Sequence, residues 1–241
     1  MIDLSRNERS ILVGTLLGDG HLELNGKDYR LQILHSYRQR EYVLWKYQNL
    51  QRLALKAPVL LGMVDHRFHK TNLGFRFQTR NDKIFNDLHR LFYHGRRKIV
   101  PVEIETMLDA QALAVWYMDD GGRRKDCRGM FLNTLSFTDE EQATLQKVLM
   151  KRWRIETRLH WVQDGYRIYI PMAMSAKFTR IIVPYLIPSM YYKLPYDPVT
   201  TEPVPLERAR RKVPDNRESK LPQNASPSIK VRGERYSLCF S

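Results

Sequence analysis

The most informative segment of the chain is Leu113-Ala114-Val115-Trp116-Tyr117-Met118-Asp119-Asp120-Gly121. It is typical of an apolar helix that ends in two aspartates and a glycine. Roughly a hundred residues earlier, Leu12-Val13-Gly14-Thr15-Leu16-Leu17-Gly18-Asp19-Gly20 has the same form. The C-terminus of a helix carries partial negative charge, so a carboxylate there is electrostatically disfavoured. Two carboxylates at matching places therefore indicate that they are held together to bind a cation.

The charge of the chain indicates a polyanionic partner. The 241 residues contain 40 Lys and Arg against 26 Asp and Glu, which is a formal net charge of +14. Nucleic acid or an anionic membrane surface would suit this excess. A membrane partner is disfavoured, because no apolar run approaches the roughly 20 residues that a span needs, and the first residues do not read as a signal or transit peptide. The two cysteines cannot form a disulfide framework or a zinc site.

Periodicity and turn signals predict the same order of elements twice. The first copy is predicted as a helix at 7–18, a hairpin around Asn25-Gly26, a helix at 39–55, a strand pair at 59–70 and 74–79, and a helix that Asn81 caps and Gly95 ends. The second copy is predicted as the helix before Gly121, a strand at 129–137, a helix from Thr138 to Trp153, a hairpin at 157–162 and 166–170, and a helix at 173–185. Each copy is therefore helix–hairpin–helix–hairpin–helix.

The repeat also holds at the level of single residues. Gln32 and Asn133 each lie 13 positions after their aspartate, and Lys98 and Lys193 each lie shortly before a proline. Two such copies are expected to pack about a pseudo-twofold axis with their glycine-bearing helices at that axis, which would place Asp19 beside Asp120. The predicted organisation is a first repeat at 1–101, a second repeat at 102–196, and a basic, proline-containing tail at 197–241 that is expected to be partly disordered.

The two motifs resemble those of the LAGLIDADG homing endonucleases, of the single-chain type with two repeats. The resemblance extends over about 5–196. It is most specific in the second motif, in Leu132-Asn133-Thr134-Leu135-Ser136-Phe137-Thr138 and in the segment that ends Met190-Tyr191-Tyr192-Lys193-Leu194-Pro195. In the first half, Val13 and Thr15 depart from the consensus. In the second motif, Asp119 stands where a small residue is usual.

The resemblance implies an α+β fold in which two αββαββα repeats form a saddle of antiparallel sheets over DNA. It also implies that one acidic residue of each repeat, Asp19 and Asp120, binds Mg²⁺, for which Mn²⁺ would substitute. The basic residue of each site falls on Lys98 and Lys193. Gln32 and Asn133, or their neighbours His35 and Ser136, are further catalytic candidates placed by the internal repeat. Asp119 is interpreted as a structural acid.

Such a site suits phosphodiester hydrolysis, which needs a nucleophilic water, charge neutralisation and a stabilised leaving oxygen. Strand alternation predicts the DNA-contacting side chains, since arginine can read guanine and glutamine adenine in the major groove. Most of these side chains are expected to contact phosphates or simply to be solvated. Beside Gln32, the candidates are Arg30, His66, Lys70, Arg76, Gln78 and Arg80 in the first half, and Arg123, Arg124, Lys125, Arg158, His160, Arg167 and Tyr169 in the second. Phe75, Phe77 and Trp161 are expected to face the core.

The leading functional hypothesis is a monomeric, sequence-specific double-strand DNA endonuclease that makes a staggered cut and promotes intron mobility. A second hypothesis is an RNA maturase that binds its host intron RNA and assists group I splicing. A third is a non-catalytic DNA-binding regulator on the same scaffold. The absence of a leader is expected for an organelle-encoded protein of a mitochondrion or chloroplast, or for a protein of the prokaryotic cytoplasm.

Overall fold

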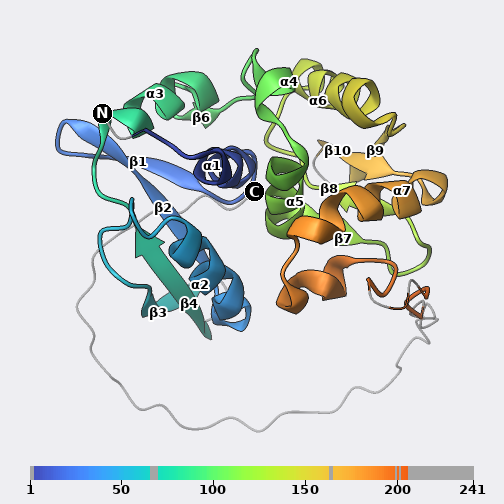
Figure 1. Ribbon diagram of the computed structural model, residues 1–241, viewed down its shortest axis with the longest axis horizontal. Coiled ribbons are helices and arrows are strands. Elements are labelled where there is room, and N and C mark those ends of the chain that lie inside the picture. Colours follow the sequence, from blue (N-terminus) through green and yellow to red (C-terminus); the bar gives the residue numbers. More distant parts are fainter. Residues whose placement is uncertain (1–2, 66–69, 163–164, 199, 201, 206–241) are drawn as a thin grey trace, which may run out of the picture.

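Two copies of one αββαββα arrangement lie side by side in the computed structural model, which describes residues 3–65, 70–162, 165–198, 200 and 202–205. Figure 1 shows the first copy in blue to teal and the second in green to orange. The first comprises α1 (Arg6–Leu17), β1 (His21–Asn25), β2 (Asp28–Ser36), α2 (Arg40–Asn49), β3 (Val59–Asp65), β4 (Lys70–Gln78) and α3 (Lys83–Phe92). The second comprises α5 (Ala110–Asp120), β7 (Gly121–Arg123), β8 (Met130–Leu132), α6 (Asp139–Trp153), β9 (Arg158–Val162), β10 (Gly165–Ile170) and α7 (Met172–Ile182). Between the copies lie the short β5 (Tyr93–His94), β6 (Arg97–Lys98) and α4 (Ile104–Met107).

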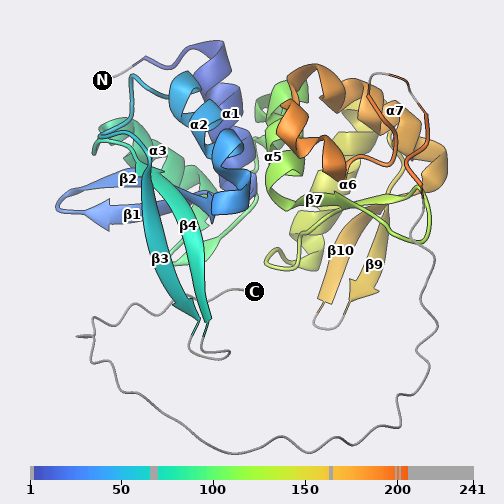
Figure 2. The ribbon, with the colours of Figure 1, turned by 90° about the horizontal axis from the view of Figure 1, so that it is seen from below.

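Each copy contains one antiparallel sheet with the same topology. The strand orders are β1-β2-β4-β3 and β7-β8-β10-β9. Figure 2 shows the central helices gathered on one side of the molecule, while β3–β4 and β9–β10 project toward the other side. The predicted fold class, two pseudo-symmetric α+β repeats with the motif helices at their interface, is confirmed.

The centre of the molecule is the contact between α1 and α5, which lie adjacent in Figure 1. A Cβ added to Gly14 would lie 2.3 Å from the Ala112 carbonyl oxygen and 2.6 Å from the Val115 Cβ. The absence of a side chain at Gly14 therefore permits the close approach of the two helix backbones. All residues from Ala112 to Asp119 on α5 are buried, so this helix forms the core on every side.

Local sequence signals begin several of these elements. Ser5 with Glu8, and Thr138 with Glu141, form capping boxes at the starts of α1 and α6. Gly26 has φ +70° in the β1–β2 turn, a conformation that glycine adopts without a steric penalty. These boundaries were predictable because the residues that set them are neighbours in the chain.

Several element boundaries differ from the prediction. The second helix ends at Asn49, and Asp82 rather than Asn81 caps α3, through a hydrogen bond from the Ile84 N–H. Helix α3 ends at Phe92, and Gly95 instead lies in the turn between β5 and β6. Strand β8 ends at Leu132 because the next residues turn, where the Thr134 hydroxyl bonds to Gln142. Helix α7 ends at Ile182 and continues as a 3₁₀ turn, η2 (Val183–Tyr185), followed by a second 3₁₀ segment, η3 (Pro188–Lys193).

The expected core position of Trp161 is wrong, while that of Phe77 is confirmed. Trp161 is 60% exposed, and Phe77 is 3% exposed. Trp161 pairs with Tyr166 toward the tip of the β9–β10 hairpin, and its ring makes an edge contact with the ring of Tyr166. None of the helices formed by the described residues is long and apolar enough to cross a membrane. Most of the predicted tail, 206–241, lies outside the described residues.

Candidate active site

The two carboxylates of the repeated motif open into one cleft. Asp120 is the last residue of α5, and Asp19 lies just beyond the end of α1. The cleft has a volume of about 770 Å³, and the described residues that line it include Asp19, Asp120, Lys98, Gln32 and Asn133. Five of the six residues predicted to be catalytic are thus brought together. The sixth, Lys193, is buried with 9% of its surface exposed.

Burial and the repulsion between neighbouring carboxylates both disfavour the charged forms of Asp19 and Asp120. Burial raises the pKa of Asp120 well above its ordinary value, and the neighbouring Asp19 and Asp119 carboxylates raise it further. Burial and the Asp119 carboxylate likewise raise the pKa of Asp19, against the opposing effect of Lys46, Lys193 and Lys98. Carboxylates that repel one another in a cleft are relieved by a bound cation. Their hard oxygen donors fit Mg²⁺ or Mn²⁺, with water and phosphate oxygens completing the shell.

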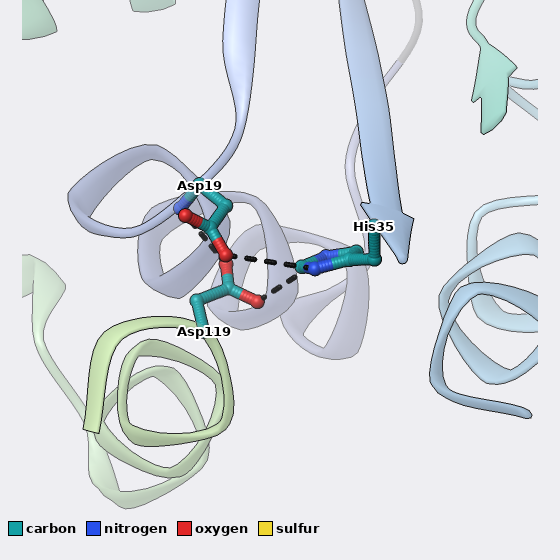
Figure 3. A group of neighbouring side chains, drawn as sticks. All are labelled: Asp19, His35 and Asp119. Atoms are coloured by element: carbon teal, nitrogen blue, oxygen red, sulfur yellow. Dashed lines mark hydrogen bonds and ion pairs between the residues drawn. The ribbon is translucent and has the colours of Figure 1, made fainter. Parts of the chain in front are cut away.

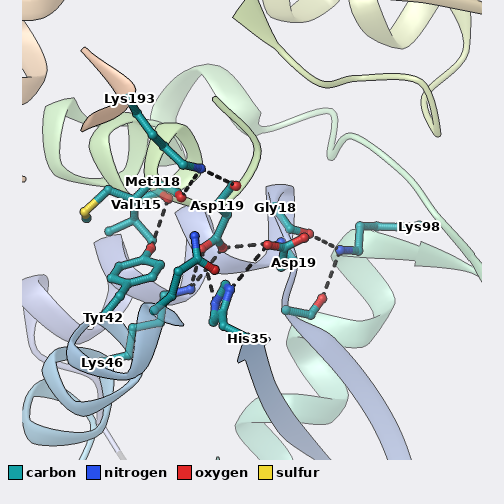
Figure 4. A network of polar contacts seen from close by, with 12 residues as sticks. Gly18, Asp19, His35, Tyr42, Lys46, Lys98, Val115, Met118, Asp119 and Lys193 are labelled. Atoms are coloured by element: carbon teal, nitrogen blue, oxygen red, sulfur yellow. Dashed lines mark hydrogen bonds and ion pairs between the residues drawn. The ribbon is translucent and has the colours of Figure 1, made fainter. Parts of the chain in front are cut away.

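Asp119 has a different role from its neighbour Asp120. Its side chain is fully buried, and its two oxygens accept hydrogen bonds from the Lys46 ammonium at 2.7 and 3.0 Å. The same carboxylate accepts the Asp19 backbone N–H at 3.3 Å. Figure 4 shows this network between the ends of the two motif helices. Asp119 is thus tied to Lys46 and to the backbone instead of opening into the cleft.

The His35 ring lies close to both Asp19 and Asp119, as Figure 3 shows. Its Nδ1 is 3.5 Å from the Asp19 carboxylate, and its Nε2 is 3.6 Å from the Asp119 carboxylate. Burial, with a further contribution from Lys46, lowers the pKa of His35 to about 4. Asp19, His35 and Asp119 are close enough to form a metal-binding group. The Lys46 ammonium disfavours a cation there, whereas Asp19 is 46% exposed and lines the cleft with Asp120.

The two lysines make matching contacts with the helix ends. The Lys98 ammonium donates to the carbonyls of Gly18 at 2.5 Å and Gly20 at 2.9 Å. The Lys193 ammonium donates to the carbonyls of Met118 at 2.5 Å and Asp119 at 2.8 Å. A cation suits these orphan carbonyls and the negative end of the helix dipole. Burial lowers the pKa of both lysines, while the nearby carboxylates oppose that change.

The two amide side chains predicted by the repeat line the same cleft. The Gln32 Oε1 accepts a hydrogen bond from the Gln78 amide at 3.0 Å, and Gln78 also donates to Glu23 at 2.6 Å. The Asn133 backbone N–H donates to the Asp120 carbonyl at 2.9 Å. Of the alternatives, Ser136 also lines the cleft, and His35 contacts Asp19 directly.

Sequence reasoning missed Lys46 and Tyr42. Both are fully buried on α2, and the Tyr42 hydroxyl donates to the Val115 carbonyl at 3.2 Å. Lys46 follows Tyr42 by one helical turn, so it lies on the apolar face of that helix. That position was the available signal, but the partner that makes a buried lysine tolerable is 73 residues away.

In the first sheet, the strand register places four predicted DNA-contacting residues on one face. Gln32 pairs with Gln78, and Arg76 lies two residues before Gln78, so it shares its face. Arg30 lies on this face with Glu23, to which it donates at 2.7 Å. Arg80 lies beyond β4 and its guanidinium donates to the Ala54 carbonyl. His66 lies outside the described residues, and of Lys70 only its place as the first residue of β4 is described.

In the second sheet, Arg158, His160, Arg167 and Tyr169 share one face. The Arg167 guanidinium lies 3.9 Å from the centre of the Phe131 ring on that face. Arg123 pairs with the buried Met130, so it lies on the opposite face, and its expected place beside the others is corrected. Arg124 forms a two-fold hydrogen-bonded ion pair with Asp126, and Lys125 lies between these two in the loop after β7.

The chain belongs to the LAGLIDADG DNA endonuclease family, whose family model matches residues 9–178. It is 32% identical over 210 residues to the DNA endonuclease I-ChuI of Chlamydomonas applanata, covering 80% of this chain and 96% of that protein. It is 30% identical over 198 residues to the cytochrome b mRNA maturase bI2 of Debaryomyces hansenii, covering 79% and 74%. The structure of the homing endonuclease I-WcaI bound to its DNA recognition sequence superposes with a TM-score of 0.76 at 25% identity, covering 82% of this chain and 89% of that one.

Proposed function

We propose that this protein is a sequence-specific, divalent-metal-dependent endonuclease that cuts both strands of a DNA target as a monomer. The observation that carries the proposal is the meeting of Asp19 and Asp120, from equivalent places in the two repeats, in one cleft. Two half-sites that face opposite strands would give a staggered break. Family membership and the DNA-bound structural relative support DNA as the partner.

Asp19 and Asp120 would hold Mg²⁺, which would supply a nucleophilic water at neutral pH and neutralise charge on the scissile phosphate. Lys98 lines the cleft and holds the chain on either side of Asp19 through the carbonyls of Gly18 and Gly20. Gln32 and Asn133, on the walls of the cleft, would orient water by hydrogen bonding. The strand-face residues Arg30, Arg76, Gln78, Arg158, His160, Arg167 and Tyr169 would contact DNA, in part through phosphates.

The biological role that we infer is intron mobility. Related proteins include an intron-encoded endonuclease of Dictyostelium discoideum, 33% identical over 123 residues. A gene within an intron, in an organelle genome, would suit such a role. Maturase activity on intron RNA is the second candidate, and the similarity to the Debaryomyces hansenii maturase over 79% of this chain supports it.

The decisive experiment is cleavage of duplex DNA that carries the gene's locus without its insertion, in Mg²⁺. We would compare the unaltered protein with Asp19→Asn, Asp120→Asn and a control, Asp87→Asn, whose carboxylate pairs with Arg90 at the surface. Loss of either site carboxylate should lower the cleavage rate by at least about a hundredfold, as removal of a group that stabilises transition-state charge does. The control should cleave as the unaltered protein does.

Each variant should still bind the duplex in a gel-shift assay without divalent metal, because the strand faces are unchanged. Binding by the unaltered protein without any break would contradict the endonuclease proposal. In that case, release of spliced exons from the host intron RNA would distinguish a maturase from a DNA-binding regulator.

A further inference from the structure

The two motif helices end differently. Helix α5 continues through Asp120, whereas α1 ends at Leu17 and Gly18 leaves the helical conformation with φ −98° and ψ −134°. The Gly20 N–H then returns to the Thr15 carbonyl at 2.8 Å. Asp120 is therefore held by a helix, while Asp19 lies outside one and needs another support.

Asp119 supplies that support from the other repeat. Its Oδ2 accepts the Asp19 backbone N–H at 3.3 Å. A Cβ added to Gly18 would lie 2.4 Å from the Asp119 Cβ, so the absent side chain of Gly18 makes room for Asp119. In the repeat, Asp119 occupies the position that Gly18 occupies in the first copy. Gly18 has no side chain that could accept the Asp120 N–H in the same way. Only the second repeat therefore supports the first through this contact.

Lys46 fixes Asp119 in place. The two side chains are both 0% exposed, and the ammonium reaches both carboxylate oxygens. The Lys46 ammonium also lies 4.5 Å from the centre of the Tyr42 ring, and the Tyr42 hydroxyl bonds to the α5 backbone at Val115. Helix α2 of the first repeat thus locks a side chain of the second repeat, which in turn holds Asp19.

Stability alone is a weak reason for such an ion pair. Replacing a buried ion pair by apolar residues of similar volume is often neutral or stabilising, because burying two charges carries a large desolvation penalty. The pair lies directly behind one of the two cleft carboxylates. A role in placing that carboxylate accounts for its position as well as its burial.

We propose that Lys46 and Asp119 are positioning residues for Asp19, with Asp119 holding the Asp19 backbone and Lys46 holding Asp119. The proposal rests on the endonuclease function proposed above. Neither residue contacts the reacting atoms, and Asp119 acts as a hydrogen-bond acceptor and not as a metal ligand. Asp120 does not depend on this pair, because its backbone lies within α5.

Two double variants test the proposal. Lys46→Met/Asp119→Ala removes both charges and the acceptor, and Lys46→Met/Asp119→Asn removes both charges but keeps an acceptor oxygen of the same size. We would measure hydrogen exchange at the Asp19 amide without metal, DNA affinity without metal, and the cleavage rate at saturating DNA in Mg²⁺. The temperature would lie well below both thermal midpoints.

The alanine variant should exchange the Asp19 amide at least about tenfold faster than the asparagine variant and cleave about tenfold to a hundredfold more slowly, as a misplaced catalytic group does. Both should bind DNA equally. Equal amide exchange and equal cleavage in the two variants would overturn the proposal. If the unaltered protein does not cleave, the endonuclease function fails, and amide exchange alone still decides whether Asp119 holds Asp19.

A single variant tests the alternative that Asp119 is a metal ligand. Asp119→Asn leaves the buried Lys46 ammonium without a charged partner, so it lowers stability and is assayed well below its thermal midpoint. The variant keeps the size of the side chain and an oxygen for the Asp19 N–H and the Lys46 ammonium. It should keep its cleavage rate within about threefold, since less than about 1 kcal/mol of transition-state stabilisation would be lost. Loss of cleavage as complete as that of Asp120→Asn would mark Asp119 as a metal ligand and overturn the proposal.

Discussion

The first and second repeats share a fold but place different residues at equivalent positions of their interface. Where the first repeat has Gly14 and Gly18, the second fills the space with Val115 and Asp119. The first repeat contributes Lys46 and His35, which face the Asp119 carboxylate of the second. A homodimer could not make these one-sided contacts, since each subunit would present the same residues to the other. Joining the repeats in one chain allows each to become the complement of its partner.

The largest effect on stability should come from the helix contact at Gly14. Gly14→Ala would place its Cβ against the α5 backbone at Ala112, which cannot move as a side chain can. The expected loss is about 3 kcal/mol of unfolding free energy, at the upper end of ordinary overpacking. Urea unfolding would measure it. Gly26→Ala is the control, since its Cβ meets open space and only the positive φ opposes it, at about 1 kcal/mol. Similar losses in both variants would mean that the two helices separate easily.

The two repeats should also differ in how their stability depends on pH. His35 of the first repeat can titrate between pH 4 and 7, whereas Ser136, at the equivalent position of the second repeat, cannot. With its pKa lowered from 6.5 to about 4, the folded His35 binds fewer protons than the unfolded one between those pH values. Its contribution to stability is therefore present above pH 6.5 and is lost as the pH falls toward 4, by about 3 kcal/mol. Urea unfolding at pH 7 and pH 4 should show a smaller loss for His35→Gln than for the unaltered protein.

The site carboxylates titrate with the opposite sign. Their pKa values are raised in the folded state, so protonation at falling pH stabilises the fold. The effect of His35 is therefore measured as the difference in unfolding free energy between the unaltered protein and His35→Gln at each pH, because the carboxylates contribute equally to both. An identical pH dependence in both would show that the imidazole is protonated in the folded protein.

The two lysines should separate stability from activity. Lys193→Met orphans two buried carbonyls beneath α5, so it should lower the unfolding free energy by about 2 kcal/mol. Lys98 lines the cleft, so water can replace its ammonium in the Lys98→Met variant. This variant should lose less than about 1 kcal/mol of unfolding free energy and should mainly cleave more slowly. Unfolding and cleavage measured on both variants would test this division. Equal stability losses would contradict it.

The smallest predicted effect is a gain. Without metal, Asp120→Asn should raise the unfolding free energy by about 1 kcal/mol, because a neutral amide removes a carboxylate whose pKa is raised by burial and by its neighbours. A shift of roughly 2–4 °C in the thermal midpoint is expected for a chain of this size. Mg²⁺ should stabilise the unaltered protein and not this variant. Asp87→Asn should change neither, and a lower midpoint for Asp120→Asn would show that no repulsion is stored there.

Much of the fold was predictable from the sequence because its signals are local. The capping boxes at Ser5 and Thr138, the hairpin turn at Gly26 and the period of the two apolar helices each involve residues within a few positions of one another. The internal repeat then extended these signals to the packing of the helices. The meeting of Asp19 and Asp120 follows from that repeat, and the cleft contains both.

The remaining features depended on contacts between distant residues. The face of Arg123 follows from its pairing with Met130, and the exposure of Trp161 from how far β9 and β10 project beyond the helices. Short runs of alternating residues do not specify such register. The same limit applied to His35, which the repeat offered only as a neighbour of Gln32.

The repeated architecture, the family and the two carboxylates that line the cleft follow from the amino-acid sequence alone. The different surroundings of Asp119 and Asp120, which are adjacent in the chain, arise only when the two repeats pack together. One lies at the end of a helix in the cleft, and the other is buried against Lys46. The physical reason is that a buried charge is tolerated only beside its partner, and that partner is brought there by the packing of one repeat against the other.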